Sequence, residues 1–120
     1  MLNKEDRKYF LNEFLRNIQG ISDKDYQQKI WICAEGPECD DFDETVCYFS
    51  ENVDSILDNY ADYGITEIQS LLLKKFRKAF EAFADENDWP PFFIESPEWK
   101  KITEMAKDVL AAFNYERKGV

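Results

Sequence analysis

Residues 41–62 read DFDETVCYFSENVDSILDNYAD, and this stretch decides the fold of the chain. When successive residues are placed about 100° apart, as in an α-helix, the apolar side chains fall into one stripe. The stripe consists of Phe42, Val46, Phe49, Val53, Ile56, Leu57 and Tyr60. Because carboxylates gather on the opposite side, the stretch predicts a helix that buries one face in a core and exposes the other to solvent.

The chain before this stretch predicts one helix and one element whose type stays open. Asn3 can cap a helix over residues 4–19, with Gly20 expected at its end. The inward face of this helix would carry Phe10, Phe14, Leu15 and Ile18. Residues 26–35 suit either a helix or a short strand near residues 29–33, because that run is rich in β-branched and aromatic side chains.

The chain after this stretch predicts two more helices. Gly64 is a natural stop for the preceding helix. Thr66 and Gln69 form a capping box for a helix over residues 67–85. Its expected buried residues are Ile68, Leu72, Phe76, Ala79, Phe80 and Phe83. Ser96-Pro97-Glu98 begins a last helix, with the proline at the first helical position.

The composition provides enough apolar material for one packed core. Of the 120 residues, 44% are apolar and 16% are aromatic, and a chain of this length usually forms one domain. No internal repeat or linker divides the sequence. We therefore predict an all-α fold in which residues 1–120 form a single acidic domain, built as a bundle of four to five helices.

The charge of the chain is concentrated in one segment. Residues 30–73 contain eleven carboxylates and no lysine or arginine, and the whole chain has a formal net charge of −10. A segregated charge of this size destabilises a compact fold through self-repulsion, so it indicates a surface that meets something basic. The same charge argues against binding to nucleic acid or to an anionic membrane, because both require exposed positive charge.

The residue types exclude several kinds of catalytic and metal site. The chain has no histidine, which removes histidine-assisted nucleophiles, histidine-ligated zinc and di-iron centres. No phosphate-binding glycine motif is present either. We therefore expect a protein that is not an enzyme and that holds no cofactor. Three cysteines and the lack of a long apolar run indicate a cytoplasmic protein without a transmembrane helix.

One acidic cluster keeps a metal-dependent enzyme as an alternative. Asp40, Asp41, Asp43 and Glu44 supply the oxygen ligands that hard cations prefer. The cluster lacks the spacing and the glycine of an EF-hand loop. Acids at the start of a helix are also explained by their favourable interaction with the backbone dipole. We therefore predict no metal site here.

The acidic segment is better explained as a surface that binds a protein. Exposed helices normally mix charges, because Glu–Lys pairs at i,i+4 stabilise them and like charges at that spacing do not. Tyrosines lie among these acids, and a tyrosine surrounded by charge is a common anchor of a protein interface. The predicted partner-binding residues are Glu35, Glu38, Asp40, Asp41, Glu44, Tyr48, Glu51, Asp58, Asp62 and Tyr63.

These features resemble the immunity proteins of bacterial toxin systems, including the colicin-like and contact-dependent systems. The resemblance rests on the small, acidic, helical character of the chain and on the run Glu38-Cys39-Asp40-Asp41-Phe42-Asp43-Glu44-Thr45. It implies a non-catalytic inhibitor that covers a basic toxin domain, such as a nuclease. The chain is longer than the colicin-type proteins, and Tyr60-x-x-Tyr63 matches their paired-tyrosine turn only loosely.

A second hypothesis uses the same surface for a different partner. In it, the chain is another acidic interaction or regulatory module, such as a DNA mimic or an adaptor for a basic cytoplasmic protein. Both hypotheses place a cationic protein on the same acidic residues. Gene order separates them, because an immunity gene is expected directly after its toxin gene.

Overall fold

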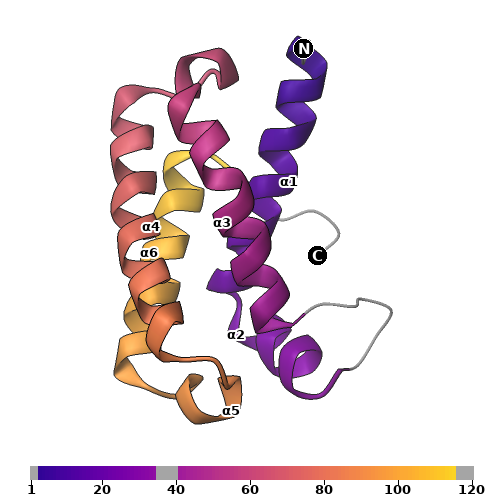
Figure 1. The fold of residues 1–120 in the computed structure, drawn as a ribbon, viewed down its shortest axis with the longest axis vertical. Helices are drawn as coiled ribbons and strands as arrows, with labels where there is room; N and C mark the ends of the chain where they lie inside the picture. Colours follow the sequence, from indigo (N-terminus) through magenta and orange to yellow (C-terminus); the bar gives the residue numbers. More distant parts are fainter. Residues whose placement is uncertain (1–2, 35–40, 116–120) are drawn as a thin grey trace.

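The computed structural model describes residues 3–34 and 41–115, and every regular element in these ranges is helical. Figure 1 shows these elements packed as a bundle. In chain order they are α1 (Lys4–Ser22), α2 (Lys24–Tyr26), the π-helix η1 (Gln27–Ile32), α3 (Phe42–Asp58), the 3-10 helix η2 (Tyr60–Tyr63), α4 (Glu67–Glu86), α5 (Pro90–Phe93) and α6 (Pro97–Ala112). The prediction of an all-α bundle is confirmed.

Four long helices form the frame of the bundle. α3 packs against α1 and α4, and α6 packs against the same two helices, which closes a ring of four (Figure 1). α5 and η1 meet at the end of the bundle where α3 begins. Phe42, in the first turn of α3, joins these parts, since its ring lies 5.6 Å from that of Trp31 and 4.9 Å from that of Phe93.

Aromatic side chains fill the centre of the bundle. Phe49 of α3 is fully buried and stacks on Phe14 of α1, with 5.4 Å between ring centroids. Its other neighbours are Phe76 and Phe80 of α4, which it meets edge-on at 5.6 and 5.2 Å. Aromatic pairs of this kind add about 0.5–1.5 kcal/mol each beyond the burial of their area. One ring therefore ties α3 to both of its neighbours.

Polar caps set the starts of the long helices, as the sequence predicts. Asn3 caps α1. At the start of α4, the backbone N–H of Gln69 donates to Thr66 Oγ1 at 3.1 Å, and the Thr66 N–H donates back to Gln69 Oε1 at 2.8 Å. Ser96 Oγ accepts from the backbone N–H of Trp99 at 3.1 Å and caps α6. These bonds satisfy backbone donors that have no partner within the helix.

Two helix ends differ from the prediction. α1 continues through Gly20 to Ser22, so Gly20 is not a stop but a helical residue that faces Tyr26. A Cβ at that position would lie 3.4 Å from the ring of Tyr26. α3 ends at Asp58, and the residues that follow form η2. Gly64 ends this segment in the left-handed conformation, with φ at 74°, as expected of a glycine stop.

Residues 24–32 are helical, so the alternative of a short strand near residues 29–33 is wrong. The fully buried Gln27 explains the difference. Its Nε2 donates to two carbonyl oxygens in the last turn of α1, at 2.9 and 2.8 Å. Its Oε1 accepts from the indole N–H of Trp99 at 2.9 Å. The helical segment is therefore held by a satisfied buried amide, which an apolar sequence pattern does not reveal.

One predicted core residue of α4 faces solvent instead. Ile68 is 79% exposed, whereas Leu73, Phe76 and Phe80 are fully buried. The buried stripe of α4 is centred on these three residues, and Ile68 lies about 80° away from Phe76 around the helix. Ile68 is therefore turned out of the core in the first turn of the helix.

Candidate protein-binding face on α3

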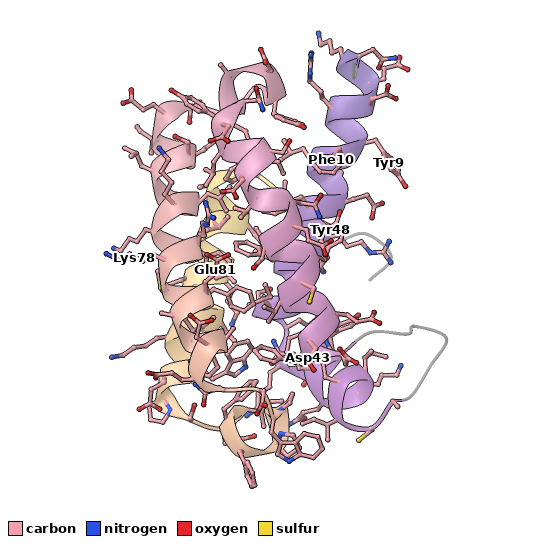
Figure 2. The ribbon with its side chains drawn as sticks, viewed as in Figure 1. Tyr9, Phe10, Asp43, Tyr48, Lys78 and Glu81 are labelled. Carbon is pink, nitrogen blue, oxygen red and sulfur yellow. The ribbon has the colours of Figure 1, made fainter. Side chains whose placement is uncertain are left out.

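The exposed side of α3 is almost entirely acidic. Its exposed residues are Asp43, Glu44, Cys47, Glu51, Asp54, Ser55 and Asp58. Five of these seven are carboxylates and none is a lysine or arginine. We call the five carboxylates the acidic face. Figure 2 shows Asp43 near the first turn of α3, on the outside of the bundle.

One member of the acidic face is ion-paired across the seam between α3 and α4. Arg77 Nη1 of α4 lies 2.6 Å from Asp54 Oδ1, and its Nε lies 3.1 Å from Glu81 Oε1. Ser50 of α3 donates from its hydroxyl to the same Glu81 carboxylate at 2.9 Å, and Figure 2 shows Glu81 between the two helices. Burial lowers the pKa of Arg77, but its bonds to Asp54 and Glu81 outweigh that effect and raise the pKa.

This ion pair lies where the charges of α3 repel each other most. Asp54 is three residues after Glu51 and four residues before Asp58, so it forms two like-charge pairs on the helix surface. Each such pair destabilises a helix by roughly 0.2–0.5 kcal/mol. Because Arg77 contacts Asp54, it offsets both repulsions at once. Arg77 of α4 therefore reduces the charge repulsion within the acidic face.

Three other carboxylates form an uncompensated row. Within residues 3–34 and 41–115, the ion pairs are those of Lys24 with Glu95 and of Arg77 with two acids, and none includes Glu44, Glu51 or Asp58. These three residues are spaced by seven positions, and the 1.5 Å rise of a helix makes the row about 21 Å long. Their charge is available to a cation outside the molecule.

The other predicted binding acids are placed differently. Asp41 caps α3, because its Oδ1 accepts a hydrogen bond from the backbone N–H of Glu44 at 2.8 Å. Asp62 is exposed in η2, beyond the end of α3. Three further predicted binding residues, Glu35, Glu38 and Asp40, lie outside the described residues.

Tyr48 lies on the side of α3 that faces α1 and is half-buried. Burial raises the pKa of its phenol, and the neighbouring Glu13 and Tyr9 raise it further by disfavouring another negative charge. Figure 2 shows Tyr48 on the side of α3 toward α1, the helix that carries Tyr9. Tyr48 is therefore partly a packing residue, and its remaining surface borders the acidic face.

Sequence reasoning does not identify Tyr9 and Glu13, which extend the same surface onto α1. Tyr9 is 68% exposed. It precedes the predicted core residue Phe10, so its outward position follows from the helical period. Its proximity to the acidic face depends on the packing of α1 beside α3, for which the sequence carries no local signal. Tyr9 and Tyr48 together give this edge of the face an apolar component.

Tyr63, the second predicted tyrosine anchor, packs onto the scaffold. It is half-buried in η2, and its ring lies 6.0 Å from that of Phe10 at an angle of 37°. The contact fixes η2 against the N-terminal half of α1. Part of the Tyr63 ring is consequently covered by α1 and is not open to a partner.

The residues of the alternative metal site are only partly described. Asp40 lies outside the described ranges, and the carboxylate of Asp41 is engaged by the backbone of Glu44. In the part of the chain that the structure describes, no three side chains of the metal-ligating types lie close enough to hold an ion.

No protein-family model matches this chain, and no match exists among curated proteins or solved structures. Within the described ranges, none of the helices is long and apolar enough to cross a membrane. The chemistry of the acidic face is therefore the basis on which a function can be argued.

Proposed function

We propose that this chain is a non-catalytic inhibitor that binds a basic bacterial toxin domain, such as a nuclease, in the manner of an immunity protein. The observation that carries the proposal is the exposed side of α3, where five of seven residues are carboxylates and none is a cation. Inhibition of this kind requires only that the toxin surface be covered. It requires no chemistry from the inhibitor.

The arrangement of charges supports recognition of a cationic protein. The row of Glu44, Glu51 and Asp58 has no internal ion pair in the described structure, so its field extends into solvent. Such a field speeds the encounter with a cationic surface, by tenfold or more at low salt. Tyr48 lies beside the row and Tyr9 of α1 lies near Tyr48, and the two rings provide contact area that persists when salt screens the charges.

The proposed compartment is the reducing cytoplasm of the cell that needs protection. The two cysteines in the described ranges, Cys33 and Cys47, carry free thiols, which supports such a compartment. The acidic face would repel nucleic acid and anionic lipid, so a protein partner fits it best.

The test uses the protein encoded directly upstream of this chain's gene. Its C-terminal domain is produced together with this chain, and the purified complex is studied at several salt concentrations. We expect a stable complex whose association rate falls at least about tenfold between low and physiological ionic strength. If the two proteins form no complex even at low ionic strength, the immunity function is wrong.

A growth assay adds the biological outcome. The upstream domain alone is expected to stop bacterial growth, and co-expression of this chain is expected to restore it. Arg77→Ala is a useful companion variant because it removes the ion pair with Asp54 and leaves the row of Glu44, Glu51 and Asp58 in place. It should therefore still restore growth.

A further inference from the structure

The short helix α5 presents two exposed aromatic side chains at one end of the bundle. Phe92 is 87% exposed, more than any other large apolar side chain in the described ranges. Trp89, three residues earlier, is 57% exposed. The backbone N–H of Phe92 donates to the Trp89 carbonyl at 2.9 Å, so the two residues belong to the same turn.

This turn is firmly anchored, so the exposure does not result from loose packing. Pro90 and Phe93 of the same turn are buried. The ring of Phe93 lies 4.9 Å from those of Phe42 and Trp99 and 5.0 Å from that of Phe83. The Ile94 N–H donates to the Pro90 carbonyl at 2.8 Å and closes the turn. The core therefore holds Trp89 and Phe92 outward.

The segment of the chain that carries the two rings is acidic. Residues 85–98 contain no lysine or arginine. Their carboxylates are Asp85, Glu86, Asp88, Glu95 and Glu98. Lys24 pairs with Glu95 at 2.7 Å, and the other four have no ion pair within the described structure. The two exposed aromatic rings are thus flanked along the chain by carboxylates, and we call these five carboxylates the rim.

We propose that Trp89 and Phe92 anchor a second interface, which takes a cationic polypeptide segment with apolar side chains. The apolar side chains of the segment cover the two rings, and its lysines or arginines meet the carboxylates around them. Aromatic residues with a charged rim are the usual composition of a protein-binding hot spot. The interface uses other residues than the acidic face, so it can fail while the proposed function stands.

The charge of the rim decides between this partner and others. An anionic membrane would be repelled by the same carboxylates that attract a cationic segment. A second copy of this chain carries a net charge of −10 and would bring two acidic rims together. A cationic and partly apolar polypeptide can cover the two rings with its apolar side chains and pair its positive charges with the carboxylates.

The test is a calorimetric titration with two synthetic peptides at physiological ionic strength. The first is an amphipathic helix with leucines on one side and lysines on the other, and the second has glutamine in place of every leucine. Their charges are equal, so a difference in affinity reports contact with apolar surface. We expect the leucine peptide to bind at least about tenfold more tightly, which corresponds to about 1.4 kcal/mol.

Fluorescence locates the contact. Trp31 and Trp99 are buried, at 9% and 1% exposure, so acrylamide quenching reports chiefly on Trp89. The leucine peptide should shift the emission of Trp89 to the blue and protect it from quenching. The glutamine peptide should do neither.

Matched variants complete the test. Trp89→Ala/Phe92→Ala should lose the preference for the leucine peptide, whereas Ile68→Ala/Leu71→Ala, which removes exposed apolar surface from α4, should keep it. Reversal of Glu44, Glu51 and Asp58 to lysine should also keep it. Equal affinity for both peptides, or equal loss in both double variants, overturns the proposal. A dimer in sedimentation that dissociates in Trp89→Ala/Phe92→Ala would overturn it too, since a second copy would then be the occupant.

Discussion

α3 and α4 lie side by side and bury the same kind of surface, yet their exposed sides differ completely. Both place phenylalanines in the core, where Phe49 meets Phe76 at 5.6 Å between ring centroids. On the outside, α3 carries carboxylates and no cation, whereas α4 carries Lys74, Lys75 and Lys78 together with acids. Figure 2 shows Lys78 directed away from α3. The buried faces of both helices must be apolar to form the core, whereas the fold does not determine the charge of their exposed faces.

The difference shows how a helix face that carries only negative charge is stabilised. Arg77 of α4 reaches across to Asp54, the acid that is repelled by both Glu51 and Asp58. α4 thus supplies the positive charge that α3 lacks. This charge lies between the two helices and leaves the exposed side of α3 without a cation. The remaining acids of the face form no ion pair within the described residues, so their charge faces solvent, as the proposed binding of a cationic partner requires.

The largest effect should come from the shared core. Phe49→Ala in α3 and Phe76→Ala in α4 each remove a fully buried ring, and each should lower the free energy of unfolding by about 3–5 kcal/mol. Urea unfolding followed by circular dichroism measures both. Similar losses would show that the two inner faces are equivalent. A variant that unfolds like the wild type would contradict the packing described here.

A smaller effect is expected at the seam. Arg77→Ala breaks the contacts with Asp54 and Glu81, and should lower the free energy of unfolding by about 1 kcal/mol, because the pair is partly exposed. Lys74→Ala, an exposed residue on the same helix, serves as the control and should change it by less than about 0.5 kcal/mol. Adding Asp54→Ala to each variant gives a double-mutant cycle. Zero coupling between Arg77 and Asp54 would show that the seam does not support the acidic face.

The smallest effect concerns pH and Tyr48. Because burial beside Glu13 raises the pKa of Tyr48, the folded state favours the neutral phenol. The resulting stability is present at neutral pH and is lost as the pH rises above about 10, the usual pKa of tyrosine. The difference in unfolding free energy between wild type and Tyr48→Phe should stay constant up to about pH 9 and then shift in favour of the variant. A difference independent of pH would place Tyr48 in open solvent.

Local signals in the sequence account for most of the fold. The apolar stripe of α3 repeats with the helical period along one continuous segment. The capping box of Thr66 and Gln69 and the stop at Gly64 each lie within about one turn, so all three signals can be recognised without knowledge of the packing. The burial of Gln27 could not be predicted, because it depends on contacts with α1 and with Trp99 that a helical period does not contain. The exposure of Ile68 does follow from its angle to Phe76 around the helix, but apolarity alone placed it in the predicted core.

In the candidate site, too, some features follow from local sequence signals and others depend on the packing of the helices. The exposure of Glu44, Glu51 and Asp58 follows from their position opposite the apolar stripe. The partial burial of Tyr48 does not, because it is produced by α1, and the ion pair of Asp54 is produced by α4. Sequence reasoning therefore predicts the acids of the face, and only the assembled bundle shows which of them remain available.

The most direct test of the acidic face compares two triple reversals that change the net charge equally. Glu44→Lys/Glu51→Lys/Asp58→Lys alters α3, whereas Glu67→Lys/Glu104→Lys/Asp108→Lys alters exposed acids of α4 and α6. The measurement is the rate of association with the proposed partner, the C-terminal domain of the protein encoded directly upstream, at low ionic strength. The α3 variant should associate at least about tenfold more slowly than the control variant, because local charge guides the encounter. Equal rates for the two variants would contradict the assignment of α3 as the binding face.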